Sequence, residues 1–320
     1  MRALAFPQRC SRRAVDGLPG GRTEGAFVSR SHAFVGLMAA GLVAGLVVVA
    51  VPVVTGSPPG AQRRCRAVTL AVSLAPDRPA DQRIAANYCE PTTWAEPRTV
   101  DVLADGTTYT GYWDWPDRTY SVVDRLLATG RATLTYDRIG TGRSSRPTDD
   151  VTLTTDVHVL DQILTWLQPN QIILFTHSYS AAVGIQLATV PGKVSQLVVT
   201  GFLHTSRDPV VARRIQPATR DHPRWRDFAA QQALPADRNP SSAVAVPVVI
   251  AVGDRDAIFC AQGNCSDAAA IERFERPFFR SAPSLRVIVA AAGHSLALDP
   301  SGPDTAARIT AALDAAAVQR

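Results

Sequence analysis

The stretch LFTHSYSAA, from Leu174 to Ala182, decides which fold this chain adopts. It follows a short apolar run and leads into AVGIQLATV, whose apolar spacing is typical of a helix. Ser178 therefore lies on a turn between a predicted strand and a predicted helix. A serine nucleophile is presented on such a turn in the pattern G-x-S-x-G, but the two glycine positions are Thr176 and Ser180 here. The stretch alone leaves open whether Ser178 is a working nucleophile, a damaged one or an ordinary turn serine.

Short β-rich runs alternate with helical patterns on both sides of this turn. Strands are predicted at 68–74, 83–89, 99–104, 132–137, 172–176, 196–201, 247–253 and 285–290, and helices at 119–130, 155–167, 180–189, 267–279 and 303–318. Apolar strands that alternate with helices indicate a mostly parallel sheet covered on both faces. The first strands have no helix between them, which predicts an antiparallel start. The stretch 203–246 is rich in Arg, Pro, Asp and Gln and is predicted to form a short lid.

Reactive side chains follow three of the predicted strands, where sites form in open α/β sheets. Ser178 follows the strand at 172–176, Asp256 follows the strand at 247–253, and His294 follows the strand at 285–290. A serine hydroxyl needs a base to take its proton, and His294 would supply it, while Asp256 would orient the imidazole. Asp254 in the same GDRD turn is the alternative acid.

Acyl transfer also needs preorganised donors for the oxyanion. The sequence predicts one donor in the backbone N–H of Tyr179, at the start of the helix after the serine. The other is expected in the loop after the strand at 99–104, and we assign it to the N–H of Thr107.

Four motifs in this order carry a family resemblance: YDRIGTGRSS at 136–145, HSY at the serine, GDRD and the final GH. With them the chain resembles the α/β-hydrolases, in particular secreted actinobacterial esterases and lipases, from about Val68 to Ala317. The resemblance implies an α/β-hydrolase fold, class α/β, with about eight strands. It also implies ester cleavage by a Ser178, Asp256 and His294 triad through an acyl-enzyme, on a small-molecule ester or acyl substrate and with no metal or cofactor.

Two positions depart from the family pattern. The usual His-Gly of the oxyanion loop is Asp105-Gly106, which would bring a carboxylate near a site that must stabilise negative charge. Thr176, which is β-branched, and Ser180 replace the two glycines beside the serine. These departures motivate an alternative from another class, a non-catalytic scaffold that binds a ligand or partner at the cell surface. A further alternative uses the same triad for acyl transfer or peptide hydrolysis.

The remaining histidines and the aromatic residues have plainer interpretations. His177 is expected to be structural and His158 to pack within a helix, whereas His204 and His222 are expected on the surface of the lid, with substrate contact as the alternative. The aromatic residues of the loop after the oxyanion position line an acyl pocket or simply pack beneath the loop: Tyr109, Tyr112, Trp113 and Trp115.

The N-terminal region has the charge pattern of a membrane-targeting segment. Six arginines against two acids precede the uncharged run at 33–55, which is long enough to span a bilayer. We predict a cytoplasmic tail at 1–32, a transmembrane anchor at 33–55, a linker at 56–67 and an external hydrolase domain at 68–320. A cleaved signal, giving a secreted protein, is the alternative. No later basic stripe is interleaved with aromatics, so a nucleic-acid partner is not expected; oligomeric state is left open.

The cysteines fit an exported domain. Cys10 lies in the predicted cytoplasmic tail, and the other four follow the apolar run. An even number of exported cysteines indicates disulfides. Of the three possible pairings we favour Cys65 with Cys89 and Cys260 with Cys265. Neither a C-x-x-C spacing nor a nearby histidine pair supports a zinc site.

Overall fold

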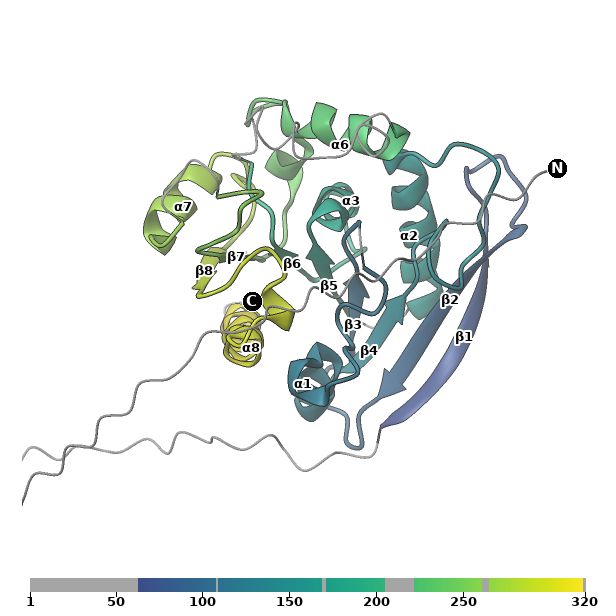
Figure 1. Cartoon of the computed structure of the whole chain (residues 1–320), viewed down its shortest axis with the longest axis horizontal. Helices are drawn as coiled ribbons and strands as arrows, with labels where there is room; N and C mark the ends of the chain where they lie inside the picture. Colours follow the sequence, from purple (N-terminus) through teal and green to yellow (C-terminus); the bar gives the residue numbers. More distant parts are fainter. Residues whose placement is uncertain (1–62, 108, 169–170, 205–221, 261–264, 319–320) are drawn as a thin grey trace, which may run out of the picture. The chain divides into compact units, whose positions relative to one another are not determined.

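The computed structural model describes residues 63–107, 109–168, 171–204, 222–260 and 265–318 (Figure 1). Eight strands form one sheet in the order β1-β2-β4-β3-β5-β6-β7-β8. The strands are β1 Arg64–Val72, β2 Gln82–Glu90, β3 Thr99–Ala104, β4 Ala132–Tyr136, β5 Gln171–His177, β6 Gln196–Thr200, β7 Val248–Gly253 and β8 Leu285–Ala290. All eight predicted strands are present, with ends that differ by up to four residues.

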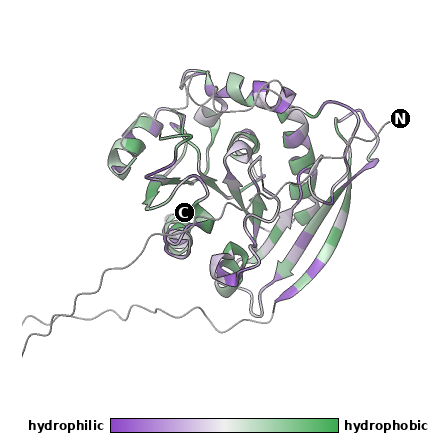
Figure 2. Cartoon of the chain, viewed as in Figure 1, coloured by the Kyte–Doolittle hydropathy of each residue, from purple (hydrophilic) through white to green (hydrophobic). Residues whose placement is uncertain are grey.

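The sheet is antiparallel only at its first edge. β1 pairs with β2 and β2 with β4 in antiparallel register, and the remaining neighbours pair in parallel. Figure 2 shows hydrophilic and hydrophobic colours alternating along β1 and β2, as is typical of a sheet with one solvated face. The expected antiparallel start and mostly parallel sheet are therefore confirmed.

Helices cover the sheet on two faces, and the alternation of side chains along β5 separates them. Ile172 and Leu174 belong to a core shared with α2 and α3, whereas Ile173 and Phe175 belong to a core shared with α1 and α8. The α-helices are α1 Val122–Ala128, α2 Leu153–Leu167, α3 Tyr179–Ala188, α6 Pro223–Gln232, α7 Ala268–Glu275 and α8 Gly302–Val318. Short 3-10 turns are η1 Arg118–Tyr120, η2 Pro240–Ala243 and η3 Leu296–Leu298.

The predicted lid contains a helix that the sequence pattern did not indicate. In its described part, helix α6 begins with Pro223, follows the capping residue His222, and lies over α2 and α3 (Figure 1). Phe228 of α6 is buried in the larger core, and Asp227 accepts a hydrogen bond from the N–H of Leu153 at 3.1 Å. This part of the stretch is thus packed onto the domain, and its role as a lid stays a prediction.

Both favoured disulfides are confirmed. Cys65 and Cys89 face each other in the register of β1 and β2 and are bonded, and Cys260 is bonded to Cys265 between β7 and α7. The predicted anchor at 33–55 lies outside the described residues. Within the described ranges, the helices include none with the length and apolar character needed to cross a membrane.

Candidate active site

The turn that carries Ser178 has a strained backbone. Ser178 has φ 53° and ψ −118°, and it alone among the described non-glycine residues has a positive φ. Its N–H donates to the carbonyl of Thr200 at 2.9 Å, and its carbonyl accepts from Ala181 at 2.9 Å. Such a conformation persists only where the surroundings hold it, and it clusters at functional sites. The turn places the serine at the carboxyl edge of the sheet, between β5 and α3.

Three predicted side chains meet at this edge. Ser178 Oγ lies 3.0 Å from His294 Nε2, and His294 Nδ1 lies 2.9 Å from Asp256 Oδ2. Asp256 is 1% exposed, and its other oxygen accepts from the N–H groups of Ile258 and Phe259. Because an ionised carboxylate only accepts hydrogen bonds, Nδ1 must carry a proton, which leaves Nε2 of neutral His294 to accept the serine proton.

The alternative acid, Asp254, does not contact this histidine. Its Oδ1 accepts from the N–H of Ala292 at 3.1 Å, and the carboxylate lies 3.6 Å from Arg255. The structure therefore brings together Ser178, His294 and Asp256, as the sequence interpretation proposed, and it places Asp254 in the supporting turn.

The two residues that replace the elbow glycines have partners of their own. Thr176 Oγ1 donates to the carbonyl of Val198 at 2.7 Å, and its methyl group occupies space left free by Gly184, where a Cβ would come within 2.5 Å of it. Ser180 Oγ donates to the carbonyl of Asp105 at 2.5 Å. Neither substitution therefore obstructs the turn.

The Asp105 carboxyl is directed into its own loop. Its Oδ2 accepts from the N–H of Gly111 at 2.7 Å, and the group is 4% exposed. Burial raises the pKa of Asp105 to about 7, although the amides of Gly111 and Tyr112 and the charge of Arg138 act in the opposite direction. The residue lines a cavity of about 270 Å³ over β2 and β4, and neither Ser178 nor His294 is among the lining residues. The carboxyl thus faces Gly111 and this cavity, and none of its hydrogen bonds within the described part of the chain joins it to Ser178 or His294.

The two predicted oxyanion donors lie on either side of the serine. Tyr179 is the first residue of α3, so its N–H has no acceptor within the helix. Thr107 follows Gly106, whose backbone packs so closely that an added Cβ would lie 3.3 Å from Ser178 Cβ and 2.9 Å from His177 Cδ2. The structure thus places the loop beside the serine, while the role of both N–H groups stays a prediction.

His177 is structural, as expected. It is fully buried, its Nδ1 lies 3.1 Å from Thr200 Oγ1, and its ring stacks on Tyr112 with centroids 4.3 Å apart. Burial, and then the neighbouring His294, holds the pKa of His177 well below its usual value. The ring is therefore neutral and adds no positive charge beside His294, whose ring centroid lies 4.9 Å away.

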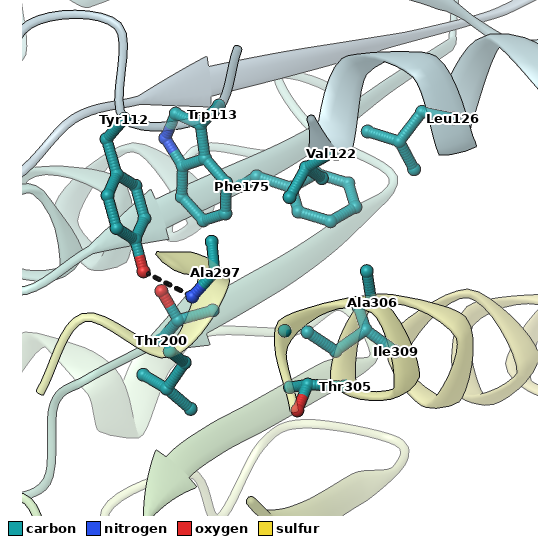
Figure 3. A pocket seen from close by; sticks show the side chains of 12 residues that line it. Tyr112, Trp113, Val122, Leu126, Phe175, Thr200, Ala297, Thr305, Ala306 and Ile309 are labelled. Atoms are coloured by element: carbon teal, nitrogen blue, oxygen red, sulfur yellow. Dashed lines mark hydrogen bonds between the residues drawn. The ribbon is translucent and has the colours of Figure 1, made fainter. Parts of the chain in front are cut away.

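Two aromatic residues of the loop, Tyr112 and Trp113, pack on the face of the sheet that α1 and α8 cover. Tyr112 and Trp113 point toward Ala297 and α8 around a cavity of about 20 Å³, and the Tyr112 hydroxyl accepts from the N–H of Ala297 at 3.0 Å (Figure 3). That volume is close to the room that one water needs, so it does not hold an acyl chain. Tyr109 hydrogen-bonds to Ser295, and Trp115 is 38% exposed. For Tyr112 and Trp113, ordinary packing is the better interpretation.

The surface placement of His204 was wrong. His204 is 2% exposed, its Nδ1 lies 2.5 Å from Glu275 Oε2, and its ring stacks on Phe278. A histidine in a polar stretch can be buried when a distant acid pairs with it, and here that acid lies in α7. His222 is exposed at the start of α6, and His158 hydrogen-bonds to Ser73, which agrees with its packing role.

A buried polar network beneath the turn was not anticipated. The Tyr179 hydroxyl donates to Asp156 of α2 at 2.8 Å, and Arg224 of α6 donates to both oxygens of the same carboxylate at 2.6 and 2.8 Å. The Arg138 guanidinium lies over the Tyr179 ring, 5.3 Å from its centroid. Arg138 belongs to the YDRIGTGRSS motif, but no local signal joins these residues.

Within the described ranges, no cluster of three or more His, Cys, Asp or Glu could hold a metal ion.

Comparison with known proteins identifies the family. A sequence model described as "Alpha/beta hydrolase family" matches residues 102–319, well over half of the chain, including Ser178, Asp256 and His294. The chain belongs to the alpha/beta hydrolase family. Among curated proteins, none matches it in sequence.

Several solved structures share the fold of this alpha/beta hydrolase. The esterase Pf2001 of Pyrococcus furiosus is 14% identical, with a TM-score of 0.56 over 82% of this chain and 94% of its own. A membrane phospholipase A, described as a bacterial virulence factor, is 14% identical, with a TM-score of 0.53 over 79% and 86%. The thioesterase domain from the curacin biosynthetic pathway is 15% identical, with a TM-score of 0.51 over 78% and 99%. At these identities the likeness is one of fold.

Proposed function

We propose that this protein is a serine hydrolase that cleaves ester bonds of small-molecule substrates through an acyl-enzyme intermediate. One observation carries the proposal: Ser178, which lies on a strained turn, forms a continuous hydrogen-bonded series with His294 and Asp256. The similarity in fold to an esterase, a phospholipase A and a thioesterase domain is consistent with acyl chemistry. The reason to favour a non-catalytic scaffold has weakened, because Thr176, Ser180 and Asp105 all have partners that leave the serine unobstructed.

The proposed mechanism follows from the positions of these groups. Ser178 Oγ attacks the ester carbonyl carbon while His294 Nε2 takes the hydroxyl proton, and Asp256 stabilises the imidazolium. The carbonyl oxygen becomes an oxyanion, which the N–H groups of Tyr179 and Thr107 would bind. When the tetrahedral intermediate collapses, the C–O bond to the alcohol breaks and His294 protonates the leaving oxygen. Water then attacks the acyl-enzyme by the same steps and releases the acid.

The test is labelling with a fluorophosphonate probe and turnover of short p-nitrophenyl esters. Folded wild-type protein is expected to be labelled and active, and Ser178→Ala is expected to lose both properties. Ser195→Ala is a matched control, because its hydroxyl donates to the carbonyl of Ile172 at the opposite end of β5. If folded wild-type protein is neither labelled nor active, or if Ser178→Ala is still labelled, the proposed function is wrong.

We further propose that the domain acts outside the cytoplasm, held by residues 33–55 or released after cleavage of that segment. The two disulfides support this location, because disulfides persist in oxidising compartments. N-terminal sequencing of the mature protein decides between the two forms. A mature N-terminus near Ser57 would indicate a secreted protein, and an intact N-terminus in the membrane fraction would indicate the anchor.

A further inference from the structure

Arg138 is a buried cation in an unusual setting. Arg138 is 4% exposed, and its Nε has no hydrogen-bond partner. Two other arginines of low exposure are paired with carboxylates, Arg131 with Asp101 and Arg224 with Asp156. Among the described residues, no carboxylate lies within ion-pair distance of Arg138. The charge of Arg138 is felt by Asp105, but a buried charge without a direct ion pair is costly, so the contacts that the guanidinium does make call for an explanation.

Those contacts are with the backbone of the predicted oxyanion loop. Arg138 Nη2 donates to the carbonyl of Gly106 at 2.9 Å and to the carbonyl of Thr107 at 3.2 Å. The peptide between Gly106 and Thr107 is trans, because the only cis bond in the described part of the chain is Glu96–Pro97. In a trans peptide the C=O and the N–H point in opposite directions. A guanidinium that holds the carbonyl of Gly106 therefore turns the N–H of Thr107 away from itself.

The same loop is fixed from its other side. Ser180 Oγ holds the carbonyl of Asp105, and the backbone of Gly106 lies against Ser178 and His177 without room for a side chain. Two successive peptides are thus oriented by side chains. Ser180 of α3 holds the Asp105–Gly106 peptide, and Arg138, in the loop after β4, holds the Gly106–Thr107 peptide. The loop has little freedom to rotate, which is what a preorganised oxyanion donor requires.

Arg138 is itself held by the residue that carries the second predicted donor. Its guanidinium lies over the ring of Tyr179, and the Tyr179 hydroxyl is bound to Asp156, which Arg224 of α6 also binds. A cation over an aromatic face is attracted to it, more so when both are desolvated. Arg138 therefore contacts both elements that carry the predicted donors, Thr107 through its carbonyl contacts and Tyr179 through its ring.

We propose that Arg138 is a positioning residue that orients the Gly106–Thr107 peptide, so that the Thr107 N–H faces the oxyanion formed at Ser178. The proposal rests on the proposed serine hydrolase function. It assigns to Arg138 an effect on the transition state, where the oxyanion exists, and little effect on binding of the uncharged ester.

The first test compares Arg138→Met with Arg143→Met on a p-nitrophenyl ester. Arg143 belongs to the same loop, is 65% exposed and pairs at 3.6 Å with Asp137, so its variant should behave like wild type. Arg138→Met is expected to lower kcat by about 100-fold, the effect of a misplaced or missing oxyanion donor. KM should stay within about threefold of wild type, because the ground-state ester carries no charge for the donor to bind. Unchanged kcat in folded Arg138→Met would overturn the proposal.

A second readout separates positioning from general loosening of the fold. A trifluoromethyl ketone adds reversibly to a serine Oγ and forms a tetrahedral oxyanion. Its inhibition constant should rise in Arg138→Met by the same factor as kcat/KM falls, since both report the oxyanion. If the inhibitor binds both proteins equally while kcat falls, Arg138 does not act through the oxyanion and the proposal is wrong.

Arg138→Lys covers the case in which Arg138→Met does not fold. Lysine keeps the charge but presents a point donor in place of a planar fork, so it can hold one carbonyl and is expected to lower kcat about tenfold at unchanged KM. Full activity of Arg138→Lys together with unfolded Arg138→Met would show that only the buried charge matters and would overturn the proposal.

The serine hydrolase function and the role of Arg138 fail in different ways. If wild-type protein is not labelled by fluorophosphonate, both proposals fall. If Arg138→Met is labelled as fast as wild type, only the role of Arg138 falls.

Discussion

The turn at Ser178 and the loop that follows β3 meet beside the same serine, yet they are held in different ways. The turn continues β5, which is paired on both sides with β3 and β6, and its strained residue is bound by backbone groups of the adjacent β6 and α3. The loop is held by side chains that lie far away in sequence, Arg138 at a separation of 32 residues from Gly106 and Ser180 at 75 from Asp105. The first is regular structure with one strained residue, and the second depends on individual long-range contacts.

The largest effect is expected at the acid that contacts His294. Asp256→Asn keeps an oxygen for the N–H groups of Ile258 and Phe259, but its amide would donate to His294 Nδ1 and favour the wrong imidazole tautomer. We expect kcat to fall on the order of 10⁴-fold, as for the corresponding change in serine proteases. Steady-state hydrolysis of a p-nitrophenyl ester measures it.

Asp254→Asn is the matched control for this prediction. Asp254 lies in the same turn, but it binds the N–H of Ala292 and no part of His294. Its variant should keep activity within a few-fold of wild type. Equal losses in the two variants would contradict the assignment of Asp256.

The contrast between the turn at Ser178 and the loop after β3 explains how much of the molecule could be predicted from the sequence. All eight strands were located, because apolar runs and their spacing reflect burial in the sheet. The three residues that meet at the site were identified because each follows a strand, and the parallel sheet brings strand ends to one edge. The direction of the Asp105 carboxyl could not be predicted, because it depends on the amide of Gly111 in the folded loop. His204 and α6 were misjudged for the same reason, since polar composition hides pairing with Glu275 and Asp156.

The next effect tests how closely the loop approaches the turn. Gly106→Ala would place a Cβ 2.9 Å from His177 Cδ2 and 3.3 Å from Ser178 Cβ. Since His177 is fully buried and stacked, the loop must shift instead, and displaced donors lower kcat by about 100-fold. Gly293→Ala is the control, because a Cβ there meets nothing within 4 Å although the residue precedes His294. Similar kcat values for the two variants would show that the contact with the turn is not needed.

A third prediction concerns the charge of the loop. Burial raises the pKa of Asp105 to about 7 from 3.8, so the folded state binds this proton more tightly than the unfolded state. The stabilising contribution is complete below pH of about 4 and is lost as pH rises through about 7. Between pH 5 and pH 8 this amounts to about 2–3 kcal/mol of unfolding free energy. Asp105→Asn has no such titration.

Chemical denaturation of both proteins at pH 5 and pH 8 isolates this group, because other titrating residues, such as buried Asp101, are shared. Wild type should lose more stability than Asp105→Asn on going to pH 8. If the two proteins lose the same amount, Asp105 is not held at a raised pKa, and the loop tolerates its charge.

The smallest effect examines how the turn accommodates a β-branched residue in place of glycine. Thr176 and Gly184 are only eight positions apart, and a Cβ at 184 would lie 2.5 Å from Thr176 Cγ2. Gly184→Ala should gain about 1 kcal/mol of stability from helix propensity but lose about 1–3 kcal/mol from overpacking, a net destabilisation of about 1 kcal/mol.

Thr176→Ser removes the methyl group and keeps the hydroxyl that donates to the carbonyl of Val198. In that background Gly184→Ala should become stabilising, because the propensity gain is then opposed only by the 3.2 Å approach to Leu174 Cδ2, the end of a flexible side chain. A double-mutant cycle measured by denaturation tests this change of sign, and an equal loss in both backgrounds would mean that Thr176 is accommodated by something other than Gly184. The reversal would show that the turn adapts through Gly184 of the helix that follows it, α3, whereas the loop relies on the distant Arg138.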